Sequence, residues 1–370
     1  MSDGAQTAAL APARRARILE ALTRDKTIRL SDLTEELGVT PVTLRRDLAQ
    51  LENEGLLVRV HGGAVAVEQE LAPPPIWDAP ERTTGTIGVL VPSLDYYWPG
   101  VVRGIEAAAR RLGLGTVLRG ASYELQDERP ALERLVRTED VSGFILAPNT
   151  DTAHAQDVIQ WLAESGRPHV LVERDALLLP SHEPVESVRS DHALGAASAA
   201  RHLAELGHKR VGLILSRTSP TSRKIAAGWH DACLELGLTT VPGFEALLPD
   251  RRTPEFSATV DGALDTALSG GLTALLVHSD PEAMAIIDLA LNRGISVPDD
   301  LSIVAYDDEI AQLFSPALTA VSPPRRAVGE AAVDLLAKRI ADPTRPVSRV
   351  VLSPTLNVRE STAPPRTSDA

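Results

Sequence analysis

Apolar residues in the first 67 positions recur first at the spacing of helices and then at the spacing of short strands. The stretch 12–24 predicts one helix, and a shorter helix is expected between Ser31, which precedes it, and Gly38, which ends it. Residues 56–67 (LLVRVHGGAVAV) predict two short strands around a pair of glycines. The expected order is therefore two helices, a third described below, and a hairpin.

The third helix is expected over residues 41–53. Thr40 suits its N-cap, and Pro41 suits its first position. Apolar positions at spacing i, i+4 and i+7 would face the core. These core-facing positions are Leu44, Leu48 and Leu51.

The opposite face of this helix carries candidates for DNA binding. Thr43 and Arg46 lie there, with Arg45 on a flank. An exposed arginine can bind guanine edges or phosphates, and a threonine can contact a thymine methyl group. Arg59 and His61 of the hairpin could reach the neighbouring backbone or the minor groove. The alternative is a solvated, charged helix face in a small packing domain.

The rest of the chain predicts an α/β fold. Residues 68–85 hold four prolines without a hydrophobic period, which is typical of a stiff, extended linker. From 86 to 363, apolar runs alternate with amphipathic stretches, so parallel sheets covered by helices on both faces are expected, in two similar lobes. The strands are expected at 86–91, 115–119, 143–147, 169–172, 210–215, 273–277 and 301–305. The helices are expected at 99–112, 128–138, 153–165, 192–206, 222–236, 256–269, 281–293 and 325–341. Residues 364–370 are expected to be a disordered tail.

Charge and composition separate the two parts. The chain has a net charge of −13, yet residues 1–67 hold equal numbers of basic and acidic side chains. DNA should therefore repel the larger part and leave the small domain in contact. No apolar run is long enough for a transmembrane helix and no secretory signal is recognisable, so a cytoplasmic location without membrane association is expected.

Several chemistries are not supported by any motif. The single cysteine, Cys233, excludes an internal disulfide and a multi-cysteine zinc site. There is no Gly-x-Ser-x-Gly, no His-Glu-x-x-His and no P-loop. No catalysis, no metal ion and no cofactor are therefore expected.

Residues 14–64 resemble the DeoR-type winged helix, through RARILEAL and above all through VTPVTLRRDLAQLENEGLLVRVHGGA. The resemblance implies a DNA-binding domain over 1–67. It places in the recognition helix and the wing the residues Thr40, Pro41, Thr43, Arg45, Arg46, Arg59 and His61. It also includes Asp47, for which supporting the helix or orienting an arginine is a better interpretation than base contact.

Polar and aromatic residues follow several expected strands of the larger part. Ligands of open α/β sheets bind outside the carboxyl ends of the strands. Asp, Arg, Ser and Thr there can hydrogen-bond hydroxyl groups, and aromatic faces can pack on a sugar ring. The segments concerned are TIGVLVPSLDYYWPG, VLVERDA, SRTSPTSRK, LLVHSD and VAYDDE. Each alone also fits a helix cap or a turn, so a binding role depends on their convergence.

The same part resembles the LacI/GalR-type effector domain, a fold shared with periplasmic sugar-binding proteins. The resemblance spans nearly all of 86–360 and includes GIEAAARRLG, VRSDHALGAASAARHLAELGHKRVGLI and LNRGISVPDDLSIVAYDD. It implies two lobes joined by three crossovers, a ligand in the cleft, and assembly into a homodimer or tetramer through this domain. Carried over by position, it implies effector contacts from Tyr96, Trp98, Glu173, Arg174, Ser219, Thr221, Arg223, Phe256, Ser279 and Asp307.

The sequence departs from that family at several positions. Glu173 stands where Asp is usual, and Ser279 replaces a common Asn. Ile225 stands where an Arg is usual, with Arg223 and Lys224 before it as substitutes. The linker 68–85 shows no minor-groove hinge helix. These departures leave the ligand and the route of the signal open.

The two parts together predict a ligand-responsive transcriptional regulator that binds a double-stranded DNA operator. A repressor of a carbohydrate uptake or catabolism operon, controlled by a sugar or a sugar-like small molecule, is the favoured interpretation. Alternatives are a regulator with a non-sugar ligand such as a nucleoside, and a transport-associated solute-binding protein. A carbohydrate-processing enzyme ranks last. Whether the ligand induces or co-represses does not follow from the sequence.

Overall fold

The computed structural model describes residues 11–25, 27–40, 43–44, 46–48, 51, 57–60, 63–66, 85–120, 129–138, 141–148, 155–240 and 245–366. The chain divides into two compact units. The first comprises residues 1–78 together with the short segment Leu313–Ser315, and the second comprises the remainder. Each unit is described by itself. Among the described residues, no helix combines the length and the apolar character needed to span a bilayer.

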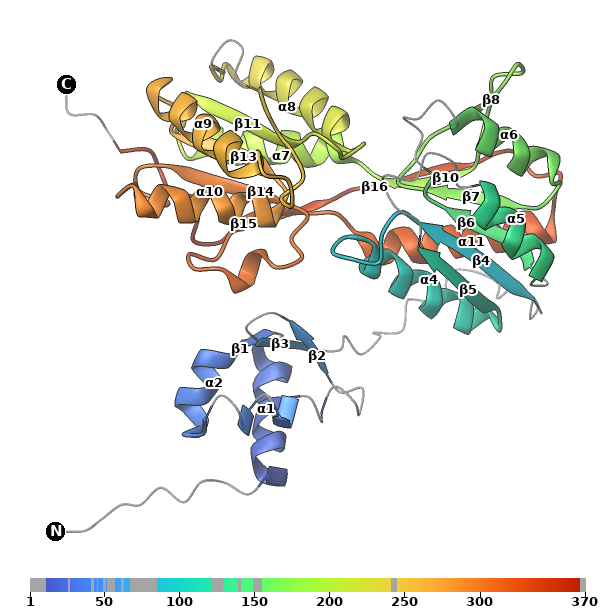
Figure 1. The fold of residues 1–370 in the computed structure, drawn as a ribbon, viewed down its shortest axis with the longest axis horizontal. Helices are drawn as coiled ribbons and strands as arrows, with labels where there is room; N and C mark the ends of the chain where they lie inside the picture. The colour runs from blue at the N-terminus through green and yellow to red at the C-terminus, as the bar shows by residue number, and fades with distance from the viewer. Residues whose placement is uncertain are drawn as a thin grey trace. The chain divides into compact units, whose positions relative to one another are not determined.

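The N-terminal unit combines helices with a three-stranded sheet (Figure 1). β3 pairs antiparallel with both β1 and β2. The hairpin of β2 and β3 was expected from the sequence, whereas β1 was not. The elements of the N-terminal unit are α1 (Ala11–Asp25), β1 (Thr27–Arg29), α2 (Leu30–Leu37), β2 (Leu57–Val60) and β3 (Gly63–Ala66).

The start of α2 corrects one expectation. Arg29 has extended backbone angles and is the N-cap, so Ser31 lies inside the first turn and does not precede the helix. Gly38 ends the helix in the left-handed conformation, as predicted. The described positions 43–44, 46–48 and 51 are helical, in agreement with the predicted third helix. Its predicted core residues are buried in one cluster with α1 and α2, and they are Leu44, Leu48 and Leu51.

The larger unit contains two lobes of similar design, which confirms the predicted α/β class. Each lobe has a six-stranded sheet. The N-lobe sheet is wholly parallel, in the order β16-β10-β7-β6-β4-β5. The C-lobe sheet runs β12-β11-β13-β14-β15-β17, and only the edge strand β17 is antiparallel.

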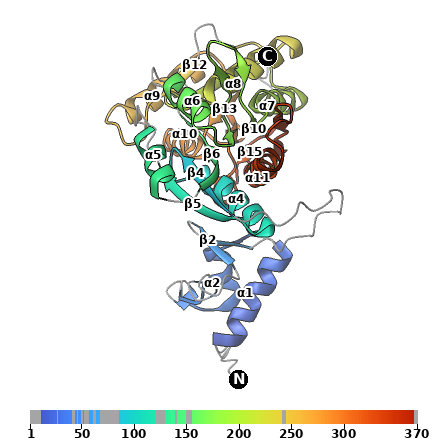
Figure 2. The same ribbon diagram turned by 90° about the vertical axis from the view of Figure 1, so that its right-hand side faces the viewer.

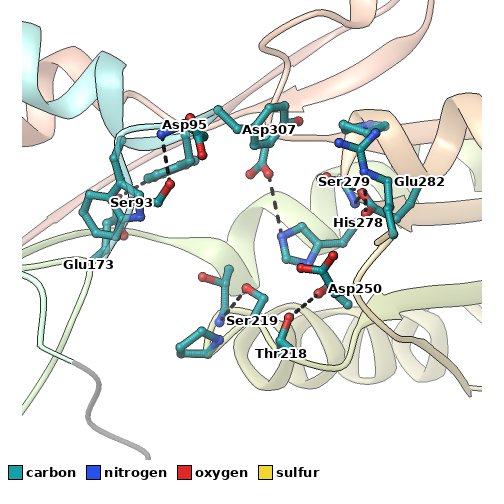
Figure 3. Close-up of a pocket in the computed structure, with 18 of the residues that line it drawn as sticks. Ser93, Asp95, Glu173, Thr218, Ser219, Asp250, His278, Ser279, Glu282 and Asp307 are labelled. Carbon is teal, nitrogen blue, oxygen red and sulfur yellow. Dashed lines mark hydrogen bonds and ion pairs between the residues drawn. The ribbon is translucent and has the colours of Figure 1, made fainter. Parts of the chain in front are cut away.

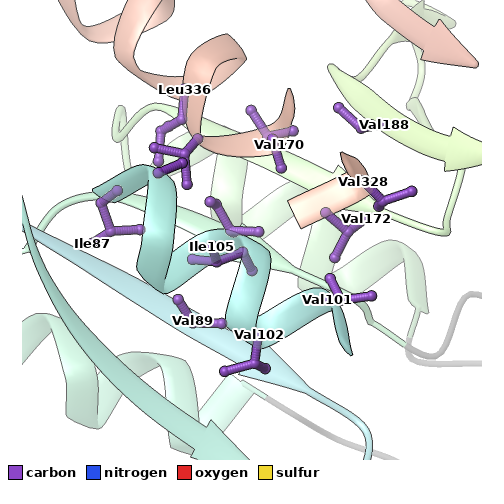
Figure 4. Close-up of a cluster of buried hydrophobic side chains, with 14 of the residues drawn as sticks. Ile87, Val89, Val101, Val102, Ile105, Val170, Val172, Val188, Val328 and Leu336 are labelled. Atoms are coloured by element: carbon purple, nitrogen blue, oxygen red, sulfur yellow. The ribbon is translucent and has the colours of Figure 1, made fainter. Parts of the chain in front are cut away.

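The N-lobe sheet is covered on both faces. Helices α4 and α11 pack on one face, where Val89, Ile105 and Val328 belong to one buried cluster (Figure 4). Helices α5 and α6 cover the other face. The strands are β4 (Thr86–Val91), β5 (Gly115–Gly120), β6 (Val141–Leu146), β7 (His169–Val172), β10 (Ser187–Ser190) and β16 (Arg349–Leu352). The helices are α4 (Trp98–Leu112), α5 (Arg129–Thr138), α6 (Ala155–Glu164) and α11 (Arg325–Ala341), and a small hairpin is formed by β8 (Leu177–Leu178) and β9 (Glu183–Pro184).

The C-lobe is built in the same way. Helices α7 and α8 pack on one face of its sheet, and α10 packs against β13, β14 and α9. The strands are β11 (Val211–Ser216), β12 (Glu245–Leu248), β13 (Ala274–His278), β14 (Ser302–Tyr306), β15 (Thr319–Ser322) and β17 (Thr355–Asn357). The helices are α7 (His192–Glu205), α8 (Ser222–Leu236), α9 (Phe256–Ser269) and α10 (Asp280–Asn292), with a short 3₁₀ turn at Ala311–Leu313.

The chain crosses between the lobes three times, as the family resemblance implied. It leaves the N-lobe after β10 to form α7, returns after β15 to form α11, and crosses again between β16 and β17. The site described below therefore lies among segments that come from distant parts of the sequence.

The end of the chain packs onto the C-lobe further than expected. His208 is buried, with Nδ1 2.8 Å from Thr273 Oγ1 and Nε2 2.9 Å from the carbonyl oxygen of Ala363. Arg366, inside the segment predicted to be a disordered tail, forms an ion pair with Asp300. The described part of that segment is thus held by the lobe.

Two N-lobe helices, α4 and α11, pack side by side (Figure 2). Their backbones come close together at Gly104. A Cβ atom at Gly104 would overlap the carbonyl oxygen of Arg326 and lie 2.9 Å from its carbonyl carbon. We therefore expect Gly104→Ala to lower the free energy of unfolding by about 1–3 kcal/mol, because backbone on both sides must move apart. Urea denaturation of the full chain measures this.

Gly262 in α9 provides the matched control. Nothing lies within 4 Å of a Cβ atom built there. Gly262→Ala should raise stability by up to about 1 kcal/mol, because alanine favours the helix. Equal free energies of unfolding for the two variants would show that α4 and α11 can move apart without destabilising the fold.

Candidate functional site

The start of the third helix in the N-terminal unit presents two hydroxyl groups. Thr43 N donates to Thr40 Oγ1 at 3.3 Å, and Leu44 N donates to Thr40 O at 3.1 Å, so Thr40 is the N-cap, as predicted. The hydroxyl oxygens of Thr40 and Thr43 are 2.9 Å apart. Arg46, one turn further on, is exposed. The predicted DNA-binding face thus offers hydroxyl groups and a guanidinium group to solvent.

Asp47 lies on a different part of this helix. Its side chain is buried, and Oδ2 accepts a hydrogen bond from Arg14 Nε of α1 at 2.6 Å. Arg15 Nε lies 3.9 Å from the other carboxylate oxygen. Asp47 therefore ties the third helix to α1, which is the supporting role expected for it.

Other predicted DNA-binding residues cannot be placed. Pro41, Arg45 and His61 lie outside the described residues, as does the side chain of Arg59. The linker expected at 68–85 is likewise outside them, apart from Gly85.

The second candidate site is a cavity of about 580 Å³ between the two lobes (Figure 3). Its walls come from residues that follow the carboxyl ends of strands in both sheets, which is where ligands of open α/β sheets bind. Residues predicted as effector contacts that line it are Tyr96, Trp98, Glu173, Arg174, Ser219, Thr221, Ser279 and Asp307. The structure therefore brings together segments that the sequence suggested only one at a time.

Glu173 follows β7 and uses its whole carboxylate on neighbouring protein groups. Oε1 accepts hydrogen bonds from Tyr97 Oη and Ser190 Oγ, both at 2.7 Å. Oε2 accepts from Ser190 N at 3.0 Å and lies 3.1 Å from His192 Nε2. Burial alone would raise the pKa of this carboxyl group, but these donors outweigh it and hold the pKa at about 2. Glu173 is thus an ionised anchor between the cavity wall and the crossover that leads into α7.

Arg174, the next residue, is fixed from two directions. Its Nε donates to Pro148 O at 3.0 Å and its Nη1 to Glu173 O at 2.9 Å. The guanidinium carbon lies 5.6 Å from the centre of the Trp98 ring. The side chain is buried yet lines the cavity, so it offers a preorganised cation to a ligand.

The C-lobe contributes His278 and Asp307 at the ends of adjacent strands. Nε2 of His278 lies 3.7 Å from Oδ2 of Asp307, and the Asp307 side chain is directed toward the cavity (Figure 3). Burial, helped by the charge of Asp280, raises the pKa of Asp307 well above its usual value. Burial also lowers the pKa of His278 to about 3, so the imidazole is neutral.

The mouth of the cavity carries charges of both signs. Arg251 Nε lies 3.8 Å from Glu282 Oε1, and Arg252 Nε lies 3.3 Å from Asp250 Oδ1. Ser279 forms a capping box at the start of α10, because its side chain accepts from the backbone there and Glu282 reaches back to Ser279 N. These arginines and carboxylates largely compensate one another.

Two predicted effector residues do not line the cavity. Arg223 is exposed on α8, and Phe256 begins α9 away from the cavity lining. Ile225, which stands where the family has an arginine, is fully buried in the C-lobe core. Lys224 does not replace that arginine in the cavity, because its Nζ instead binds Asp175 Oδ2 at 3.3 Å across the lobes.

Several lining residues were not predicted, among them Tyr97, His278, Asp250, Arg251 and Arg252. Tyr97 and His278 belong to segments that follow expected strands, so the strand-end rule could have identified them as lining residues. The residues 250–252 follow β12, a strand that the hydrophobic pattern did not predict.

Comparison with protein-family models agrees with the two-part organisation. Residues 14–70 match the DeoR-like helix-turn-helix domain, and residues 200–362 match the periplasmic binding protein-like domain. An uncharacterized HTH-type transcriptional regulator in the aml 5′ region of Streptomyces limosus is 33% identical over 290 residues, which cover 76% of this chain and 80% of that protein. The HTH-type transcriptional regulator MalR of Streptomyces coelicolor is 30% identical over 351 residues, which cover 91% and 97% of the two chains.

A solved structure extends the similarity to three dimensions. The LacI family transcriptional regulator from Enterococcus faecium, crystallised with ribose, superposes with a TM-score of 0.62 and 25% identity over 75% of this chain and 99% of that one. The fold and the sequence relatives agree with one another. This chain belongs to the LacI family of HTH-type transcriptional regulators, and its helix-turn-helix domain is of the DeoR-like kind.

Proposed function

We propose that this regulator represses an operon for carbohydrate uptake or catabolism, and that a carbohydrate bound between the lobes changes its affinity for the operator. One observation carries the proposal: the cavity is lined from both lobes by hydroxyl, carboxylate and aromatic side chains. These are the groups that bind sugar hydroxyls and sugar ring faces. Ribose in the structure of the Enterococcus faecium regulator supports the same ligand class.

A ligand that contacts both lobes prefers the lobe arrangement that satisfies both sets of contacts. Operator affinity then changes by the difference in ligand affinity between the two arrangements. We propose that the chain acts as a homodimer, which places two recognition helices on half-sites about 34 Å apart or a multiple of it. It would act in the cytoplasm, where the operator DNA is, and would release its ligand chemically unchanged.

Anisotropy of labelled DNA from the region upstream of its own gene tests this proposal. We expect ribose, glucose, maltose or cellobiose to change the operator dissociation constant of the full chain by about 5- to 150-fold. Thermal unfolding in the same buffers reports occupancy independently, because a bound ligand raises the melting temperature. Stabilisation by a saccharide with unchanged operator affinity would contradict the proposed coupling.

A further inference from the structure

His278 is the one imidazole that lines the cavity among the described residues, and its ring is held in a defined orientation. It lies edge-on to Tyr306, with the ring centres 5.6 Å apart. Ser222 Oγ donates its only proton to Ser216 O at 2.6 Å. The 3.4 Å contact between Ser222 Oγ and His278 Nδ1 therefore needs Nδ1 to carry the proton. Nε2 of the neutral ring is left as a hydrogen-bond acceptor.

That acceptor faces the Asp307 carboxyl group across a gap. The separation of 3.7 Å between Nε2 and Oδ2 is longer than a hydrogen bond, so the two groups do not satisfy each other. A ligand atom placed beside both can bond to each of them. Because Asp307 takes up a proton more readily than an exposed carboxyl group, the pair can offer one acceptor and one donor.

Hydroxyl groups suit such a pair, because each both donates and accepts. A phosphate group at pH 7 mainly accepts hydrogen bonds and carries a negative charge of about 1.5 to 2. In this cavity it would meet the lone pair of His278 and the carboxyl groups of Asp307 and Glu282. Three arginines line the cavity, but all three are already engaged by protein groups. Arg174 donates Nε and Nη1 to backbone carbonyl oxygens, and Arg251 and Arg252 lie close to carboxylates.

Resting on the proposed carbohydrate response, we infer that His278 is a specificity-determining residue: its Nε2 and the Asp307 carboxyl group together bind adjacent hydroxyls of a neutral saccharide and select against phosphorylated sugars. This role goes beyond the contacts that the family resemblance implies, which do not include position 278.

Titration calorimetry of the full chain supplies the first test. The probes are ribose, glucose, maltose and cellobiose, together with ribose 5-phosphate and glucose 6-phosphate. We expect a neutral saccharide to bind, and its phosphorylated form to bind at least about tenfold more weakly. Tighter binding of a phosphorylated sugar would overturn the inference. If no probe binds, the carbohydrate proposal and the inference fall together.

Two substitutions at one position supply the second test. His278→Asn keeps an amide near Nδ1, beside Ser222, but removes the group at Nε2, whereas His278→Gln places an amide near Nε2. For the neutral saccharide that binds, Asn should weaken affinity about 10- to 100-fold, and Gln should restore it to within about tenfold of the unsubstituted chain. His230→Asn, on the exposed face of α8, is the matched control and should not change affinity.

Combination with Asp307→Asn distinguishes joint recognition from general damage. If both residues bind the same pair of hydroxyls, the double variant should lose clearly less affinity than the product of the two single losses. Thermal unfolding of each ligand-free variant verifies that it folds. Unchanged saccharide affinity in His278→Asn, or losses that simply multiply, would overturn the inference while leaving the carbohydrate proposal intact.

Discussion

Arg46→Ala is expected to weaken operator binding strongly while leaving effector binding intact. Arg46 is exposed one turn beyond the N-cap of the predicted recognition helix, so its truncation should remove the proposed DNA contact without disturbing the core. A specific arginine contact contributes about 1–3 kcal/mol. A homodimer would lose it at both half-sites, which corresponds to roughly 30-fold to 10⁴-fold weaker binding. Anisotropy with operator DNA at fixed salt measures the loss.

The control must remove one positive charge elsewhere. Arg110 on the exposed part of α4 lies in the effector unit, so Arg110→Ala tests the general effect of net charge. We expect it to change operator affinity less than about threefold. Loss of saccharide binding in Arg46→Ala would contradict the modular organisation, and equal DNA affinities for the two variants would exclude Arg46 from the interface.

Glu173→Gln is expected to destabilise the effector unit by about 3 kcal/mol at pH 7, because it removes a buried carboxylate whose ionised form is stabilised by the donors around it. The glutamine has one acceptor oxygen where the glutamate has two. Its amide group would face either the hydroxyls of Tyr97 and Ser190 or the backbone N–H of Ser190 and His192 Nε2. Only hydroxyls can turn to accept from it. Denaturant unfolding measures the difference.

The pH dependence of this difference follows from the pKa of Glu173. It is held at about 2 in the folded chain against an ordinary value of 4.5, so the ionised group stabilises the fold above about pH 4.5. That contribution is lost as the pH falls through about 2. The difference in free energy of unfolding between the unsubstituted chain and Glu173→Gln should therefore be constant near neutral pH and should decrease below pH 4.5.

An exposed glutamate serves as the control for this variant. Glu235 is 68% exposed and lies 3.6 Å from Arg201. Glu235→Gln should change stability by less than about 1 kcal/mol at any of these pH values. If Glu173→Gln were as stable as Glu235→Gln, the crossover would not depend on the Glu173 carboxylate.

The sequence predicts the longer elements of the fold well, because their apolar periodicity reflects burial on one face. It misses short strands that are ordered by pairing with neighbouring strands and have no clear hydrophobic pattern of their own. β10 reads Ser-Val-Arg-Ser, which is typical of a loop, yet it is largely buried because β7 and β16 pair with it on either side. β12 is half exposed at the edge of its sheet, and its apolar run, Ala246–Leu248, is only three residues long.

The cavity was predictable only where a strand was predictable. Glu173 and Asp307 follow strong apolar strands, so the strand-end rule finds them. Position-by-position carry-over also supplied Arg223 and Phe256, but it cannot tell which way a side chain projects from its helix. The hydrogen-bond partners of Glu173 come from two segments far from it in the sequence, Tyr97 and residues 190–192, and no local pattern encodes their meeting.

The three crossovers also determine how much of the chain must be synthesised before each lobe can fold. The N-lobe needs α11 and β16, and the C-lobe needs β17, so neither lobe is complete before residue 352 or residue 357 has been added. The helices and strands that the structure describes in the N-terminal unit all lie within the first 66 residues, and only the short segment Leu313–Ser315, which groups with this unit, comes later. Domains generally fold as units, and the N-terminal domain emerges first from the ribosome. We therefore expect the helix-turn-helix unit to fold early in translation, well before the effector cavity can form.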